Sequence, residues 1–180
     1  MTITTLLLDR DGVINKKIDN GYVTRVNQLE FIESTFQFIS SINSHYLKIG
    51  IITNQQCVAK GIISIDQLEV IHNRVSDEFK FRSLPIPKFW VCPHFAKTCN
   101  CRKPSSTLVL QALSEFENPP VETVLMVGDS DSDVFAANNA NIRVLHLQDN
   151  CLINACPAIA HSYKQLDYGV EQLPTQPTVE

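Results

Sequence analysis

The sequence has no block of like charge longer than two or three residues, although it carries 15 basic and 19 acidic residues and a net charge of −4. Charges that are balanced this evenly give no electrostatic attraction to nucleic acid or to an anionic membrane, and we expect the protein to bind neither. No apolar run approaches the roughly 18 residues that a membrane-spanning helix needs. The first residues, MTITTLLLDRDG, contain no basic segment ahead of the apolar run and turn acidic at Asp9, unlike a signal peptide. We therefore expect a cytoplasmic protein.

The chain also lacks internal repeats and low-complexity segments. Its 180 residues, 44% of them hydrophobic, are enough to build one complete core. We expect one domain over residues 1–150. The periodic pattern weakens beyond it, so residues 151–180 are expected to form a C-terminal extension that packs on this domain or trails from it. The modest size and even charge favour a monomer.

Strand-like and helix-like segments alternate along the domain. Apolar, β-branched runs predict strands at 3–9, 48–54, 87–93, 122–129 and 142–147. Apolar residues at helical spacing predict helices between them, at 30–46, 64–82, 105–116 and 132–141. Ser64 is a plausible N-cap of the second helix. Continuous apolar strands separated by helices are typical of a parallel sheet covered on both faces. The sequence therefore predicts an α/β, Rossmann-like fold with three αβα layers.

Polar residues gather where the predicted strands end. They are Asp9–Asp11, Thr53–Gln55, Gly128, Asp129 and Asp133, joined by Arg102 and Lys103, which are predicted to open the helix before the fourth strand. In such folds the loops after the strands form the ligand crevice, so these residues should share one rim. Asp9 and Asp129 could supply carboxylates to Mg²⁺, which prefers oxygen ligands and leaves positions for a substrate phosphate. Lys103 and Thr53 could hold the phosphate oxygens.

Four of these segments resemble the motifs of the haloacid dehalogenase (HAD) superfamily of phosphohydrolases. LLLDRDG is similar to its DxDG motif, IITN to its second motif, Arg102–Lys103–Pro104 to its lysine motif, and VGDSDSD to its acidic fourth motif. All four occur in the order of that superfamily, over residues 6–133. The resemblance implies a phosphatase with a HAD fold.

The resemblance also implies a role for each motif residue. Asp9 would be the nucleophile that forms an aspartyl-phosphate, and Asp11 the acid that protonates the leaving alcohol and later the base that activates water. Mg²⁺ would be held by the carboxylates of Asp9 and Asp129 and by the backbone carbonyl of Asp11. Thr53 and Lys103 would stabilise the transferred phosphoryl group. Two alternatives are open for Asp133, which would orient Lys103 or face solvent at the start of its helix.

The segment FWVCPHFAKTCNCRKP holds four metal-ligand side chains within ten residues: Cys92, His94, Cys99 and Cys101. Three thiolates and one imidazole form a complete tetrahedral set for Zn²⁺, which indicates a closed, structural site. Such a site would stiffen a loop that has little apolar content of its own. The other cysteines have no comparable spacing and are expected to be plain thiols: Cys57, Cys151 and Cys156.

This loop resembles that of small HAD phosphatases that lack a large cap domain. Two families of that subgroup compete, the heptose 1,7-bisphosphate 7-phosphatases of lipopolysaccharide synthesis and the histidinol-phosphate phosphatases. GYV and TNQQCVAKG are similar to segments of the heptose enzymes, whereas the short FAKT between His94 and Cys99 is closer to the histidinol type. Gln56–Cys57 stands where the heptose enzymes usually have Ser-Gly. Ser130 follows the aspartate of the fourth motif, where a basic residue is common. The resemblance implies a substrate pocket lined by Arg10, Lys17, Ile18, Asp19, Asn20, Asn54, Gln55, Gln56 and Arg102.

Three other classes of protein fit the sequence less well than a phosphatase does. A phosphate-ligand binder without turnover would lack Asp9, Asp11 or Lys103, and all three are present. A phosphotransferase would need a cap to exclude water, and the segments 15–30 and 56–63 are too short for one. A zinc-dependent nucleic-acid module would need more basic neighbours than Lys97 beside its cysteine loop. A phosphatase acting on a small phosphorylated metabolite is therefore favoured. Of the two families that it resembles, we favour the heptose 1,7-bisphosphate 7-phosphatases and keep the histidinol-phosphate phosphatases as the alternative.

Overall fold

The structure, a computed structural model, describes residues 2–42 and 46–147. Strands and helices alternate along it: β1 (Thr5–Leu8), α1 (Glu33–Ser41), β2 (Lys48–Asn54), α2 (Ile65–Phe81), β3 (Lys88–Cys92), α3 (Thr107–Glu115), β4 (Val124–Gly128), α4 (Asp131–Asn139) and β5 (Arg143–His146). Short 3-10 turns at Val26–Gln28 and Val121–Thr123 complete the order. Each predicted strand and helix is confirmed. The predicted extension 151–180, with Cys151 and Cys156, lies outside the described residues.

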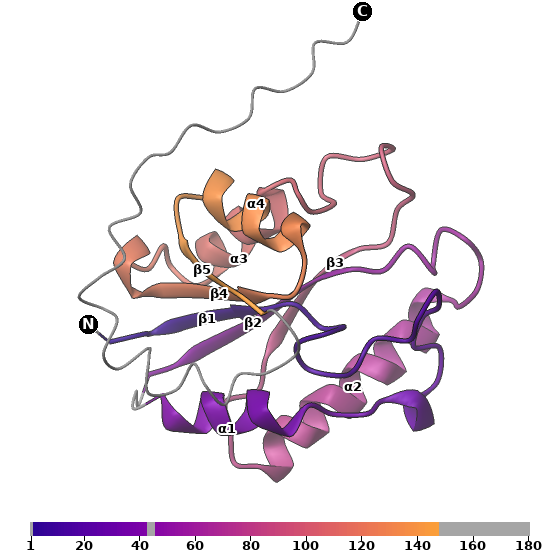
Figure 1. The fold of residues 1–180 in the computed structure, drawn as a ribbon, viewed down its shortest axis with the longest axis horizontal. Helices are drawn as coiled ribbons and strands as arrows, with labels where there is room; N and C mark the ends of the chain where they lie inside the picture. The colour runs from indigo at the N-terminus through magenta and orange to yellow at the C-terminus, as the bar shows by residue number, and fades with distance from the viewer. Residues whose placement is uncertain (1, 43–45, 148–180) are drawn as a thin grey trace, which may run out of the picture.

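The five strands form one parallel sheet in the order β3-β2-β1-β4-β5. β1 is central, and Leu8 pairs with Ile51 of β2 on one side and with Val127 of β4 on the other. Helices α1 and α2 cover one face of the sheet and α3 and α4 the other, as Figure 1 shows. The predicted three-layer αβα architecture is therefore confirmed. Loops, rather than an inserted domain, connect β1 to α1 and β2 to α2.

The core follows from the alternation of side chains along β1. Leu6 and Leu8 pack into the apolar cluster beneath α1 and α2, while Leu7 packs into the cluster beneath α3 and α4. Because neighbouring residues of a strand point to opposite faces, a sheet covered on both sides needs apolar residues at every position. The run TLLL of β1 is buried throughout. This burial holds the end of β1 rigidly at the rim.

Two helices begin later than predicted, and both shifts affect the rim. The helix predicted from residue 30 begins at Glu33, because Phe31 forms a β-bridge with Asn15 and Ile32 N–H donates to the carbonyl of Ile14. The helix predicted from residue 105 begins at Thr107, so Arg102 and Lys103 lie in the loop before it. In contrast, Ser64 caps α2 as predicted, since its Oγ accepts from the Gln67 N–H at 3.1 Å.

In the part of the chain that the structure describes, no helix is both long and apolar enough to cross a membrane.

Candidate active site

A tight turn after β1 brings the first acids to the rim. Asp9 N–H donates to the carbonyl of Val127 at 2.9 Å, and the N–H groups of Ile14 and Asn15 donate to the carbonyl of Arg10 at 2.8 and 3.1 Å. Gly12 in this turn has a φ of +95°, and a Cβ built there would lie 1.9 Å from Oδ2 of Asp129. The position therefore needs glycine for its conformation and for the close approach of the acid that follows β4.

Three carboxylates meet beside one buried lysine. Carboxylate oxygens of Asp9, Asp129 and Asp133 lie within 4.8 Å of one another. Lys103 is 3% exposed, and its Nζ lies 2.9 Å from Oδ1 of Asp9 and 2.5 Å from Oδ1 of Asp133. The same ammonium donates to the carbonyl of Ile52 at 2.7 Å. Ion pairs with these two acids raise the pKa of Lys103 although its burial acts in the opposite direction, so the lysine stays charged.

The pKa of Asp9 reflects above all its burial beside the other acids. Burial raises the pKa of the Asp9 carboxyl to about 6; the Lys103 ammonium counteracts part of this effect and the charge of Asp133 adds to it. A further cation at this position would favour the ionised carboxylate that a nucleophile requires. The cluster therefore has the electrostatics of a divalent-cation site.

Asp129 has the free ligand atom that such a site requires. Its Oδ1 is buried and has no hydrogen-bond partner within the described residues. Its Oδ2 lies 2.5 Å from the ammonium of Lys17, a half-exposed side chain on the loop after β1. An oxygen buried without a partner costs free energy unless a ligand satisfies it, and carboxylate oxygens are the ligands that Mg²⁺ prefers. The residues present therefore fit Mg²⁺.

Asp133 faces Lys103, which is the first of its two predicted alternatives. It is fully buried, and its Oδ2 accepts from the N–H of Ser130 at 3.1 Å and from the Ser130 hydroxyl at 2.6 Å. A Cβ on Gly128 would lie 2.1 Å from Cβ of Asp133, so the glycine that ends β4 makes this approach possible. The fourth motif thus supplies Asp129 to the candidate metal site and Asp133 to the lysine.

Asp11 is held by a separate network on the other side of Asp9. The Arg10 guanidinium donates to both of its oxygens, from NH2 at 2.8 and 3.0 Å, while Asn15 Nδ2 and Gln55 Nε2 donate at 2.9 and 2.8 Å. These partners lower the pKa of Asp11, although burial acts against them. Arg10 is completely buried and its guanidinium turns inward to Asp11, so its predicted contact with substrate stays a prediction.

The other residues predicted to line the pocket divide into two groups. Asn54 and Gln55 are occupied by the protein: Asn54 pairs with the backbone of Lys103 at 3.1 and 3.2 Å, and Gln55 donates to Thr53 Oγ1 at 2.8 Å. They therefore position neighbouring groups instead of facing a substrate. The remaining side chains stay exposed or half-buried around the rim: Lys17, Ile18, Asp19, Asn20, Gln56 and Arg102. Sequence reasoning missed Asn15, whose position four residues after Asp11 was the available signal.

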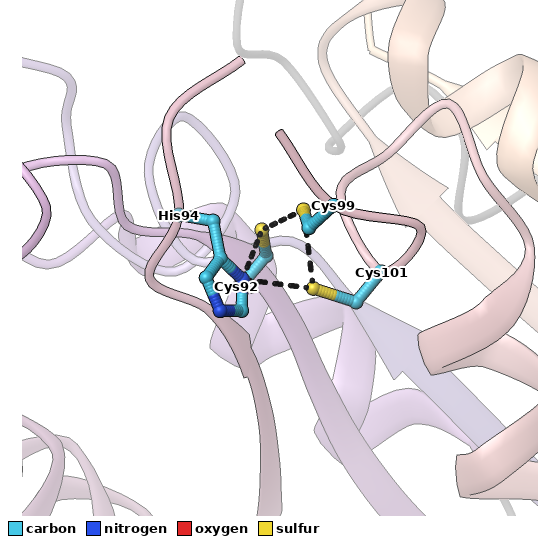
Figure 2. A group of neighbouring side chains, drawn as sticks. All are labelled: Cys92, His94, Cys99 and Cys101. Atoms are coloured by element: carbon cyan, nitrogen blue, oxygen red, sulfur yellow. Dashed lines mark hydrogen bonds between the residues drawn. The ribbon is translucent and has the colours of Figure 1, made fainter. Parts of the chain in front are cut away.

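The four predicted zinc ligands converge. Figure 2 shows Cys92, His94, Cys99 and Cys101 pointing toward one another from the end of β3 and the loop after it. Neighbouring sulfurs lie 3.4 and 3.5 Å apart, and Nδ1 of His94 lies 3.2 Å from the sulfur of Cys101 and 3.8 Å from that of Cys92. Ligands around tetrahedral Zn²⁺ stand roughly 3.5–3.8 Å apart, so the set fits this metal.

Comparison with known proteins agrees with this geometry. The HAD-hydrolase-like family model matches residues 100–149. The D-glycero-beta-D-manno-heptose-1,7-bisphosphate 7-phosphatase of Pasteurella multocida (strain Pm70) is 29% identical over 179 residues, which cover 96% of this chain and 94% of that protein. The D-glycero-alpha-D-manno-heptose-1,7-bisphosphate 7-phosphatase of Mycobacterium tuberculosis (strain CDC 1551 / Oshkosh) is 35% identical over 135 residues, covering 74% of this chain and 71% of that protein.

A solved structure extends the likeness to three dimensions. The D,D-heptose 1.7-bisphosphate phosphatase from B. bronchiseptica, complexed with magnesium and phosphate, matches with a TM-score of 0.71 and 25% identity over 79% of each chain. Sequence identity, coverage and fold therefore agree with one another. The chain belongs to the HAD-like hydrolases and, within them, to the family of the heptose-1,7-bisphosphate 7-phosphatases.

Proposed function

We propose that the protein is a Mg²⁺-dependent phosphatase that removes the 7-phosphate of D-glycero-D-manno-heptose 1,7-bisphosphate through an aspartyl-phosphate. One observation carries the proposed chemistry: Asp9 is fixed at the end of the central strand and paired with Lys103, beside an Asp129 oxygen that has no partner among the described residues. The names of the relatives support the choice of substrate. The protein is expected to act as a monomer in the cytoplasm, where reduced cysteines are available to zinc.

The proposed reaction has two steps. The partners of Asp11 favour its carboxylate form, so in the proposed first step Asp11 takes up the proton of the monoanionic phosphate ester as the ester binds. A carboxylate oxygen of Asp9 then attacks phosphorus, the bond to the ester oxygen breaks, and Asp11 gives that proton to the departing alkoxide. Asp11, now a carboxylate, then takes a proton from water as that water attacks the aspartyl-phosphate and releases phosphate. Mg²⁺, held by Asp9, Asp129 and the backbone carbonyl of Asp11, would reduce repulsion between the anionic nucleophile and the anionic phosphate.

The side chains around Asp9 are assigned to different parts of the substrate. Lys103 places a fixed positive charge beside the nucleophile, where negative charge on the transferred group increases. Thr53 is buried near the end of β2, where its Oγ1 accepts from Gln55 Nε2 at 2.8 Å, and we assign it to the phosphoryl group as well. Lys17 and Arg102 supply positive charge from the loops, so we assign them to the sugar or to the phosphate that is not cleaved. Ile18, Asp19, Asn20 and Gln56 complete this outer ring.

The substrate is tested by comparing two phosphate esters. We expect kcat/KM for heptose 1,7-bisphosphate, measured with each anomer, to exceed that for histidinol phosphate by more than about tenfold, or 1.4 kcal/mol in transition-state binding. The short FAKT segment favours the second substrate, so its family is the specific alternative. Faster cleavage of histidinol phosphate would reject the heptose assignment and keep the phosphatase mechanism.

We further propose that the cysteine loop binds one structural Zn²⁺. Cys101→Ser should reduce the zinc content well below one atom per chain and lower the melting temperature, because the loop loses a ligand that joins it to β3. Elemental analysis and thermal unfolding measure both effects. Cys57→Ala is the matched control, since Cys57 is buried away from the cluster and should retain the zinc. A wild-type protein that contains no zinc when purified without chelators would contradict the proposal.

A further inference from the structure

A buried histidine lies behind the Asp11 network, outside the residues that the proposed reaction uses. His72 is on α2, beneath the sheet in Figure 1, and is 7% exposed. Its Nε2 lies 3.3 Å from NH1 of Arg10. Its ring stacks on Phe89 of β3 with centroids 4.4 Å apart and planes inclined by 13°. The stacking fixes the plane of the imidazole ring, and within this plane Nε2 faces Arg10.

The contact gives NH1 of the Arg10 guanidinium a hydrogen-bond acceptor. Its Nε and NH2 donate to Asp11, and NH2 also donates to Oε1 of Gln55 at 3.1 Å. Within the described residues, the partner recorded for NH1 is His72. A completely buried guanidinium that lacks an acceptor on one side would turn toward other oxygens, because an unsatisfied charged donor is costly.

His72 can accept this hydrogen bond only as a neutral imidazole with its proton on Nδ1. Burial lowers the pKa of His72 to about 3, the positive charge of Arg10 contributes in the same direction, and the charge of Asp11 opposes both. The histidine is therefore neutral at physiological pH. Its chemistry is that of a fixed acceptor for Arg10 and not that of a proton donor.

We propose that His72 is a positioning residue for proton transfer by Asp11. His72 holds NH1 of Arg10, and the opposite side of the same guanidinium aligns the two oxygens of Asp11. The inference rests on the proposed function and concerns one part of it. The role of His72 concerns the protonation of the departing alkoxide by Asp11, and not the attack by Asp9 on phosphorus.

Two substrates separate these events. Glycerol 2-phosphate releases a strongly basic alkoxide, so its P–O bond breaks efficiently only if Asp11 supplies a proton to the oxygen that takes the electron pair. p-Nitrophenyl phosphate releases a stabilised phenolate, which departs without a proton. Because kcat/KM covers the steps up to this bond cleavage, misplacing Asp11 should lower it for the first ester and leave it almost unchanged for the second.

The test uses His72→Leu, which keeps a similar volume without an acceptor, and His72→Gln, whose amide oxygen can replace Nε2. We expect the leucine variant to lose roughly 10- to 100-fold in kcat/KM on glycerol 2-phosphate, a part of the usual contribution of a general acid, and less than about threefold on p-nitrophenyl phosphate. The glutamine variant should recover most of the loss. Glu69→Gln, one turn earlier on the exposed side of α2, should change neither value.

The outcomes distinguish this inference from the function on which it rests. Equal losses on both esters, no loss on either, or no recovery with glutamine would overturn the role of His72, because a purely structural defect lowers both rates together. A wild-type protein that cleaves neither ester in the presence of Mg²⁺ would overturn the proposed function and the inference with it. Selective loss on the alkyl ester, recovered by glutamine, would establish the role.

Discussion

Asp9→Asn is expected to lower the rate of phosphate-ester hydrolysis by about 10⁴-fold or more, because an amide cannot attack phosphorus. The fold should survive the change. The amide oxygen of asparagine can still accept from Arg10 N–H, as Oδ1 of Asp9 does at 2.7 Å, and Lys103 keeps its ion pair with Asp133. Release of phosphate with Mg²⁺ present measures the activity, and thermal unfolding measures the fold.

A matched exchange separates the loss of the nucleophile from a general loss of negative charge. Asp131→Asn makes the same replacement at the exposed first residue of α4, near the acid cluster but outside it, and should leave turnover within about twofold. Turnover by Asp9→Asn at a rate close to that of wild type would contradict the assignment of Asp9. Loss of activity in both variants would show only that negative charge on this rim matters.

Lys103→Met is expected to have the second largest effect, and it should affect stability as well as activity. The methionine leaves Asp9 and Asp133 facing each other without the ammonium that lies between them. Removing one partner of a buried ion pair costs about 3–5 kcal/mol in the free energy of unfolding. Loss of the fixed charge beside the phosphoryl group should lower kcat/KM by roughly 10²- to 10³-fold. Denaturant unfolding and steady-state kinetics measure the two effects.

The double variant Lys103→Met with Asp133→Asn tests the cause of each loss. It removes the lysine together with one of its two acids, so much of the lost stability should return while the activity stays low. Recovery of activity along with stability would mean that Lys103 acts through the fold alone. No recovery of stability would mean that charge repulsion between the acids is not the source of the defect.

The fold was predictable because each element has a local signal. The run TLLL, buried on both faces, and the apolar spacing of α2 are visible in the sequence without knowledge of their partners. The meeting of Asp9, Asp129 and Lys103 followed from the parallel sheet, since the carboxyl ends of its strands share one edge. The convergence of the cysteine loop was predictable for a different, local reason, because its ligands lie within ten residues.

The direction of Arg10 was not predictable from its neighbours in the sequence. Arg10 lies in the tight turn after β1, where side chains do not alternate regularly between two faces, and its side chain turns inward. Its partners Gln55 and His72 are 45 and 62 residues distant along the chain. No periodic pattern links these positions, and only the packing of α2 and β2 around β1 brings them together. The same holds for Asn54, whose contact with Lys103 spans 49 residues.

Chemical trapping of the phosphorylated enzyme tests the central claim most directly. Borohydride reduces an acyl phosphate but not a free carboxylate, so an aspartyl-phosphate at position 9 is converted to homoserine. Protein quenched with borohydride during turnover of heptose 1,7-bisphosphate should show homoserine at position 9, identified by peptide mass spectrometry, whereas Asp9→Asn should show none. Turnover without homoserine at position 9, or with homoserine at another aspartate, would contradict the role of Asp9 as the nucleophile.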